Sequence, residues 1–404
     1  MRTLRTFHTL AAMNRRMIRM LTFTVLLLSL GEVLFLQWAS LTLRGVGLDV
    51  TLAVAAVVAF GAFNLYALRW VRGRLHSRGI PLVLSRVWLL GSVAVLLTGA
   101  LLAAAFVLVG GGFRVAGLDQ SAPTALAWTG GACVLIGFGS VLWGASVGNY
   151  RVRIDRVELP ARGFAARHRD LRIVHITDLH IGPLLGPERV AEFVARVNQL
   201  EPDLVMITGD IFDFDPGYVN AGCAELARLS GRHGVYAVLG NHDVYTGADI
   251  VAGGLECHTS IRLLRNEWDP LEIDGSVMAV AGIEDPGQGW TERESESPVL
   301  ERIANEIPAD LPSVLLAHRP SYFEQAAHLD FSLVLSGHTH GGQVALPLAH
   351  HYNPSRLISR QTRGIFHSLG STLYVSRGIG MAGLPLRINC PREIALLRLA
   401  KMLY

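Results

Sequence analysis

Lysine is almost absent from this sequence of 404 residues, in which Lys401 is the only one. A P-loop nucleotide triphosphatase is therefore excluded, because its phosphate cradle needs a Gly-Lys pair, and Schiff-base lysine chemistry is disfavoured. Cysteine is also scarce: the four residues are widely spaced and form no CxxC pair. That spacing argues against a zinc-thiolate site and against a disulfide framework.

Charge is scarce and unevenly distributed. Only 17% of the residues are charged, while 50% are hydrophobic. Residues 1–148 contain 12 arginines and three acids, whereas residues 149–404 contain 24 basic and 30 acidic residues. Because the excess positive charge lies in the more apolar part, the basic pI does not indicate a nucleic-acid partner, and none is expected.

Four apolar runs occupy the first 148 residues. They cover about 20–43, 50–68, 87–110 and 125–147. A helix needs roughly 20 apolar residues to cross the hydrocarbon core of a bilayer, and each run reaches or approaches that length. We therefore expect residues 1–148 to form an all-α transmembrane module of four helices, with membrane lipids as its partners.

The arginines that flank these runs predict the orientation of the chain. Ten of them lie before the first run or between the second and the third: Arg2, Arg5, Arg15, Arg16, Arg19, Arg69, Arg72, Arg74, Arg78 and Arg86. The other two connections carry one arginine each, Arg44 and Arg114. Since positively charged loops stay in the cytoplasm, residues 149–404 are expected at the cytoplasmic face of the inner (cell) membrane.

Two features inside the apolar runs suggest helix contacts. Glu32 is costly to expose to lipid, so it should face the interior of the bundle, as a polar contact between helices or as part of a ligand site. Gly130, Gly137 and Gly144 recur every seven residues, which predicts a face on which a neighbouring helix packs closely.

Residues 149–404 alternate between short apolar runs and amphipathic segments. Strands are expected near 151–157, 171–177, 204–208, 235–239, 277–281, 314–317, 333–336, 373–376 and 394–399, and helices near 187–200 and 219–229. Strands separated by helices indicate an α/β domain. His175 lies inside one of the strands and is expected in the core.

Polar side chains follow five of these strands. They are Asp178 and His180, then Asp210, then Asn241 with His242 and Asp243, then His318, and finally His338 and His340. Ligand sites of α/β sheets lie at the carboxyl ends of the strands, so these side chains are expected to meet. Mixed carboxylate, amide and imidazole ligands suit manganese, iron or zinc better than magnesium.

Seven of these residues are candidate metal ligands, which is too many for one ion. They are Asp178, His180, Asp210, Asn241, His318, His338 and His340. The sequence therefore predicts two divalent metal ions that share a bridging carboxylate.

The order of these motifs (DxH, GD, GNHD, H, GHxH) resembles the calcineurin-like metallophosphoesterases. The segment 337–343 (GHTHGGQ) and the tail 387–394 (RINCPREI) are similar to a bacterial, membrane-associated branch of that family. The resemblance covers about residues 150–400. It implies an α/β four-layer sandwich, αββα, for the metallophosphoesterase domain at 149–404.

The resemblance also implies a role for each residue. Asp178, His180 and His340 would hold one metal ion, Asn241, His318 and His338 the other, and Asp210 would bridge them. His242 would protonate the leaving oxygen of a phosphate ester, and Asp243 would orient its imidazole. No covalent enzyme intermediate is required, because metal-activated water can attack phosphorus directly.

The function expected from the sequence is hydrolysis of a phosphodiester or pyrophosphate bond by a membrane-anchored enzyme. A lipid-linked substrate is a hypothesis that rests on the four apolar runs and on the basic segment 350–363, which could bind an anionic headgroup or be an ordinary loop. Two alternatives stay open: a tethered phosphodiesterase for soluble substrates, and a membrane sensor or scaffold that only binds a ligand. The GxGxxG match at 378–383 is not followed by a helical pattern, so it does not indicate nucleotide binding.

Overall fold

The structure, a computed structural model, describes residues 15–72, 80–288, 296–346 and 348–401. Arg2, Arg5, Arg74 and Arg78, which contribute to the predicted orientation, lie outside these residues. Contacts divide the chain into two compact units, Met1–Trp143 and Gly144–Tyr404. The division falls a few residues before the boundary at 148 that the sequence suggests.

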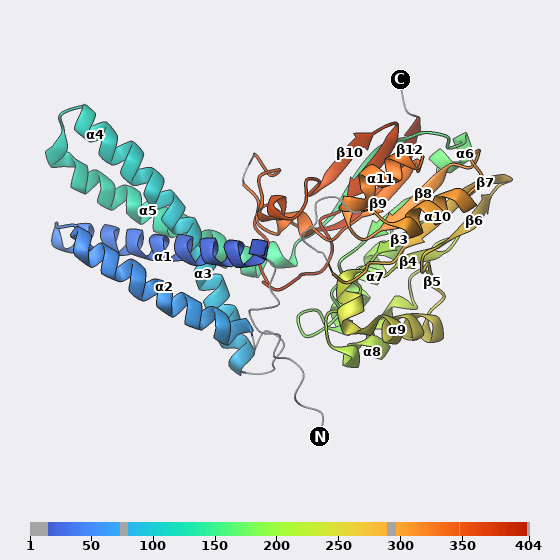
Figure 1. Cartoon of the computed structure of the whole chain (residues 1–404), viewed down its shortest axis with the longest axis horizontal. Helices are drawn as coiled ribbons and strands as arrows, with labels where there is room; N and C mark the ends of the chain where they lie inside the picture. Colours follow the sequence, from blue (N-terminus) through green and yellow to red (C-terminus); the bar gives the residue numbers. More distant parts are fainter. Residues whose placement is uncertain (1–14, 73–79, 289–295, 347, 402–404) are drawn as a thin grey trace. The chain divides into compact units, whose positions relative to one another are not determined.

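The first unit is helical (Figure 1). Its long helices are α1 (Arg15–Arg44), α2 (Val50–Arg72), α3 (Ile80–Ala105) and α5 (Ala122–Trp143), and between the last two lie the short elements η2 (Phe106–Gly110), α4 (Gly111–Val115) and η3 (Asp119–Ser121). Four segments are long and apolar enough to cross a membrane: Thr22–Arg44, Val50–Val71, Val83–Phe113 and Ala122–Gly148. They confirm the four apolar helices expected from the sequence. Many of their large side chains, such as Leu52 and Leu135, point outward, as a lipid solvent allows.

Polar and small residues hold this bundle together. The amide of Asn64 on α2 donates a hydrogen bond to Glu32 Oε2 on α1 at 2.9 Å, so the predicted polar contact between helices is present. The indole of Trp38 covers Gly130, and Thr98 covers Gly137, so closely that a β-carbon would collide at either glycine. The predicted helix-packing face is confirmed at these two positions. Gly144, the third glycine of the pattern, is covered by Leu386, Arg387 and Ile388, which belong to no helix.

Two six-stranded sheets form the second unit (Figure 1). The first has the order β1-β12-β2-β3-β4-β5 and contains β1 (Val152–Ala161), β12 (Arg392–Lys401), β2 (Ile173–Ile176), β3 (Leu204–Thr208), β4 (Val235–Val238) and β5 (Arg262–Leu263). The second has the order β10-β11-β9-β8-β7-β6 and contains β10 (Gly364–Ser368), β11 (Ser371–Val375), β9 (Leu333–Ser336), β8 (Ser313–Ala317), β7 (Ser276–Ile283) and β6 (Glu267–Ile273). Strands β2, β3 and β4 run parallel to one another, as do β7, β8 and β9.

Helices cover the outer faces of both sheets. The outer face of the first sheet packs on α7 (Pro187–Asn198), α8 (Val219–Leu226) and α9 (Asn241–His258). The outer face of the second sheet packs on α10 (Pro298–Glu306) and α11 (Phe323–His328). A third apolar cluster lies between the sheets. Strand β3 shows why its sequence is apolar throughout: Val205 and Ile207 face the helices, while Leu204 and Met206 face the other sheet. The predicted four-layer αββα sandwich is confirmed.

The short elements of this unit are η4 (Gly144–Gly148), α6 (Ala166–Arg169), η5 (Pro216–Tyr218), η6 (Pro320–Tyr322), η7 (His340–Gly342) and η8 (Pro354–Leu357). His175 is fully buried on β2, where its Nε2 lies 2.8 Å from Thr208 Oγ1 and burial lowers its pKa to about 3. A neutral, hydrogen-bonded imidazole in the core agrees with the sequence-based prediction.

Candidate metal centre

The carboxyl ends of strands from both sheets meet at one place in the second unit. Backbone pairing continues past the strands: Asp178 N donates to Gly209 O at 3.0 Å, and Gly337 N donates to His318 O at 3.0 Å. All seven predicted ligands follow these strand ends. Five of them have positive φ angles, between 50° and 68°: Asp178, His180, Asp210, His338 and His340. Such left-handed backbone is unfavourable for residues other than glycine and concentrates at functional sites.

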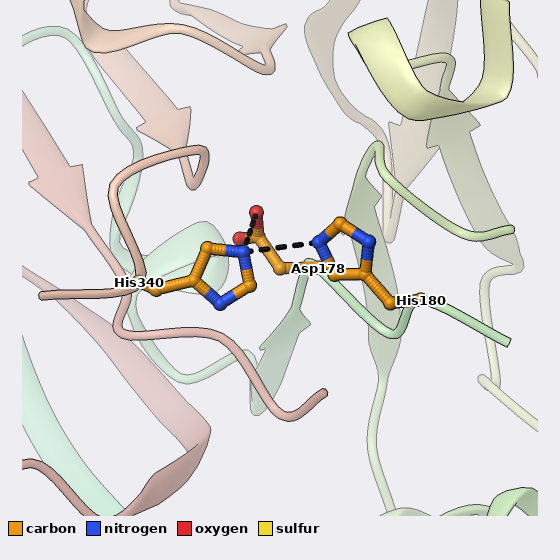
Figure 2. A group of neighbouring side chains, drawn as sticks. All are labelled: Asp178, His180 and His340. Carbon is orange, nitrogen blue, oxygen red and sulfur yellow. Dashed lines mark hydrogen bonds and ion pairs between the residues drawn. The ribbon is translucent and has the colours of Figure 1, made fainter. Parts of the chain in front are cut away.

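Asp178, His180 and His340 form the first cluster and point toward one another (Figure 2). His340 Nε2 lies 3.3 Å from Asp178 Oδ1 and 3.0 Å from His180 Nε2. All three side chains are buried, although His180 and His340 are 160 positions apart in the sequence. Two imidazole nitrogens and a carboxylate oxygen that converge on one point form a suitable ligand set for a divalent metal ion.

Asp210 connects two further clusters. It lies in one with His180 and His242, and in another with His318 and His338. Its Oδ2 atom is 3.6 Å from His180 Nε2 and 3.2 Å from His318 Nε2. His338 Nδ1 is in turn 3.2 Å from His318 Nε2. Asp210 therefore lies close to imidazoles from two of the clusters.

Asn241 provides a test of whether the site fits metal ions. Its side chain is buried, and within the part of the chain that the structure describes its Oδ1 atom has no hydrogen-bond partner. A buried acceptor without a partner is costly, and a metal ion would satisfy it. The donor set of carboxylate, amide and imidazole groups at this site therefore fits divalent metal ions.

The electrostatics of the site follow from burial and close contact. Burial by itself would raise the pKa of Asp210, but nearby imidazoles, His318 foremost, hold that pKa well below its usual range. In return, although burial opposes it, Asp210 raises the pKa of His318 to about 10. Burial and His180 lower the pKa of His340, so its ring stays neutral and keeps a lone pair available. The site attracts positive charge at its centre.

His242 lies beside the metal-binding side chains. Its backbone N–H donates to Asp210 Oδ1 at 2.8 Å, and its ring Nδ1 lies 2.7 Å from Asp213 Oδ1. Burial lowers the pKa of His242, but Asp210 and Asp213 together raise it above its usual value. A protonated imidazole held by a carboxylate on its other nitrogen is well suited to donate a proton.

The expected role of Asp243 differs from what the structure shows. Its carboxylate accepts backbone N–H groups from Ile211 at 3.1 Å, Phe212 at 2.8 Å and Gly240 at 2.9 Å, which fixes the turn after β3 and the start of α9. The carboxylate that contacts the His242 ring is Asp213, which the sequence analysis did not single out. Asp213 follows the GD motif by three residues, and only the folded chain brings it back to His242.

An aromatic wall borders His242. The rings of Phe214 and Tyr245 stack with centroids 5.5 Å apart, and the imidazole lies 4.8 Å from Phe214 and 5.4 Å from Tyr245. Phe214 has a φ angle of 58°, which is strained for a bulky residue. The strained backbone of Phe214 places its ring beside the candidate acid.

The glycine-rich segment at 378–383 packs against the backbone of Asp178, a candidate ligand. No helix follows it, since residues 376–391, all of them described, connect β11 to β12 without one. Gly380 N donates to Asp178 O at 2.7 Å, and a β-carbon there would collide with the backbone of Asp178 and Leu179. Buried Arg387 donates to the carbonyls of Gly378 at 3.2 Å and Gly380 at 2.8 Å. The segment holds Asp178 in place and is not a nucleotide-binding turn.

Comparisons with known proteins agree with this geometry. The sequence model of the family described as calcineurin-like phosphoesterase matches residues 171–342. An uncharacterized metallophosphoesterase of Campylobacter jejuni is 33% identical over 57% of this chain and 59% of its own length. A transmembrane protein with metallophosphoesterase domain from Bos taurus is 32% identical over 60% of this chain and 55% of its own. An uncharacterized metallophosphoesterase of Aquifex aeolicus is 31% identical over 64% of this chain and 97% of its own.

This chain belongs to the calcineurin-like phosphoesterase family. Members of that family use divalent metal ions, and the three side-chain clusters are the candidates to hold them here. The matches to the Campylobacter jejuni and Bos taurus proteins span somewhat more than half of those proteins. The four apolar helices and the relative named as a transmembrane protein indicate a membrane protein.

The different contacts of Asp213 and Asp243 predict different consequences when each is replaced by asparagine. Asp213→Asn removes the charge that faces His242, and we expect hydrolysis to slow by about 10- to 100-fold with little change in the unfolding temperature. Asp243→Asn places an amide against three backbone N–H groups, and we expect the unfolding temperature to fall by several degrees, since such bonds are worth about 1.5–3 kcal/mol each. Steady-state kinetics and thermal unfolding of both purified variants measure the difference. If Asp213→Asn hydrolyses at the wild-type rate, the assignment of Asp213 is wrong.

Proposed function

We propose that this protein is a membrane-anchored phosphoesterase that hydrolyses a phosphodiester or pyrophosphate bond with the aid of two divalent metal ions. The observation that carries the proposal is the position of Asp210, whose Oδ2 atom lies 3.6 Å from His180 of one proposed ligand set and 3.2 Å from His318 of the other. Asp178, His180 and His340 would hold one ion, and Asn241, His318 and His338 the other. When bound, the ions supply Lewis acidity toward the phosphoryl oxygens and activate water as the nucleophile.

The side chains around the ions would complete the reaction. His242 would donate its proton to the oxygen of the leaving group, while Asp213 stabilises the imidazolium and fixes the ring through Nδ1. Asp210 would hold the backbone of His242 through its N–H, so that the acid and the ligands keep one geometry. Membership of the phosphoesterase family supports this assignment over a ligand-binding sensor or scaffold.

Removing the proposed bridge should abolish hydrolysis. We expect protein treated with a chelator to be inactive toward a generic aryl phosphodiester and to regain activity with Mn²⁺. Asp210→Ala should hydrolyse this ester at least about 1,000-fold more slowly, because the two ligand sets lose their shared carboxylate. The measurement is release of the aryl alcohol, with bound metal determined by elemental analysis. His175→Gln, which changes a buried imidazole outside the clusters, is the control. Unchanged turnover in Asp210→Ala, or none with any divalent metal in the wild type, contradicts the proposal.

The substrate is proposed to be lipid-linked. Support comes from the four membrane-spanning helices and from the basic segment that follows His340. We expect kcat/KM for a phosphodiester or pyrophosphate attached to a lipid, in mixed micelles, to exceed that for a water-soluble ester of the same leaving group by about 10-fold or more, because binding energy away from the reacting bond contributes to catalysis. Equal values for the two substrates would favour the alternative of a tethered phosphodiesterase for soluble substrates.

The phosphoesterase unit is proposed to lie at the cytoplasmic face of the inner membrane. Support comes from the arginines, which gather before the first span and between the second and third spans. A reporter fused after Tyr404 should therefore be active when it is of the type that works in the cytoplasm, and a phosphatase reporter that needs export should be silent. The opposite pair of signals would reverse the orientation.

A further inference from the structure

The loop that follows the last candidate ligands exposes apolar side chains. This loop, residues 344–346 and 348–363, is called the basic loop here. Leu346 is 55% exposed, Leu348 102%, Tyr352 61% and Leu357 53%. Single exposed apolar residues are ordinary on a soluble surface, but four within 12 positions of one loop mark an interaction surface.

The charge of the same loop has one sign. No acidic residue occurs between Asp330 and Glu393, a stretch that contains the whole loop. Arg356 and Arg360 are exposed, and so are His350 and His351. Leucine and tyrosine side chains combined with arginines and no acids match the chemistry of the interface of an anionic bilayer, where apolar groups enter the acyl region and arginines contact phosphates.

The loop is tied to the metal centre by short hydrogen bonds. Thr339, which lies between the candidate ligands His338 and His340, donates through Oγ1 to Thr362 O at 2.6 Å. Ser355 Oγ donates to Thr339 O at 2.6 Å, and Asn353 Nδ2 donates to Thr362 Oγ1 at 3.1 Å. These bonds fix the loop relative to His338 and His340, so a surface that the loop contacts also lies at a fixed distance from the two histidines.

We propose that the basic loop is a membrane-contact surface, which inserts Leu346, Leu348 and Leu357 into the interface of an anionic bilayer and so holds the metal centre at the level of lipid headgroups. The spans of the same chain keep a bilayer at a high effective concentration near the loop, so weak contacts suffice. The inference rests on the proposed function only in its consequence, that a lipid-linked phosphate is the ester within reach. The contact itself is independent of hydrolysis.

The test measures how close the loop comes to lipid chains. In the full chain, the exposed thiol is removed by Cys257→Ser, and Leu348→Cys is labelled with a fluorophore; the remaining cysteines are buried. The protein is reconstituted in nanodiscs of anionic phospholipid that contain chain-attached nitroxide quenchers. Leu369→Cys is the matched control, since Leu369 is an apolar residue 60% exposed on the turn between β10 and β11, outside the basic loop.

We expect the label at position 348 to be quenched about twofold or more beyond the label at 369, because chain-attached nitroxides reach only groups that enter the interface. High salt, zwitterionic nanodiscs or the Arg356→Glu/Arg360→Glu pair should each reduce the difference, since surface attraction is screened or reversed. Equal quenching at 348 and 369 overturns the proposal, as does disulfide formation between two copies of the chain through the unlabelled thiol of Leu348→Cys. Leu357→Cys gives the same readout if Leu348→Cys does not fold.

Failure of this experiment and failure of the proposed function are distinguishable. Quenching needs neither metal nor substrate, so it can be present in an Asp210→Ala background that hydrolyses nothing. Conversely, normal turnover of an aryl phosphodiester by a protein whose labels are not quenched would support the proposed hydrolase activity and contradict the proposed membrane contact.

Discussion

The second unit must stabilise two buried carboxylates, Asp178 and Asp210, that lie near each other. Neither carboxylate is open to water, so neighbouring groups must compensate their charge. Backbone N–H groups do part of this: His338 donates to both oxygens of Asp178, at 3.0 and 3.1 Å, and His242 donates to Asp210. The remainder falls to imidazoles, of which His318 and His180 lie close to both carboxylates. Bringing strand ends of two sheets together is the geometry that supplies all these partners at once.

Much of this arrangement was readable from the sequence because its periodicities are local. Apolar runs of four or five residues predicted the buried strands β3 and β9 to within a residue, and the side chains after them are the ones that converge. The four apolar helices were equally visible, because their length is imposed by the bilayer and not by packing partners.

What the sequence could not give depends on contacts between distant segments. The carboxylate of Asp213 reaches His242 across 29 positions, and no spacing rule distinguishes it from Asp243, which lies next to His242 in sequence but turns to backbone amides. The same holds for Gly380, whose importance lies in its contact with Asp178 and not in the GxGxxG pattern that it completes. In the first unit, Glu32 was placed correctly inside the bundle, but its partner Asn64 emerged only from the folded helices.

The position of β12 has a consequence for biosynthesis. This strand pairs along its whole length with β1 and also with β2, so the first sheet is split until residues 392–401 are available. The glycine-rich segment that contacts Asp178 lies just before β12 in the sequence. The guanidinium of Arg392 donates hydrogen bonds to Ile379 O, in that segment, and to Asn149 Oδ1, which precedes β1. A chain emerging from the ribosome makes these apolar helices before residues 392–401. The cluster of candidate ligands is thus completed only after the apolar helices have been synthesised, so the second unit folds when the apolar segments have already left the ribosome.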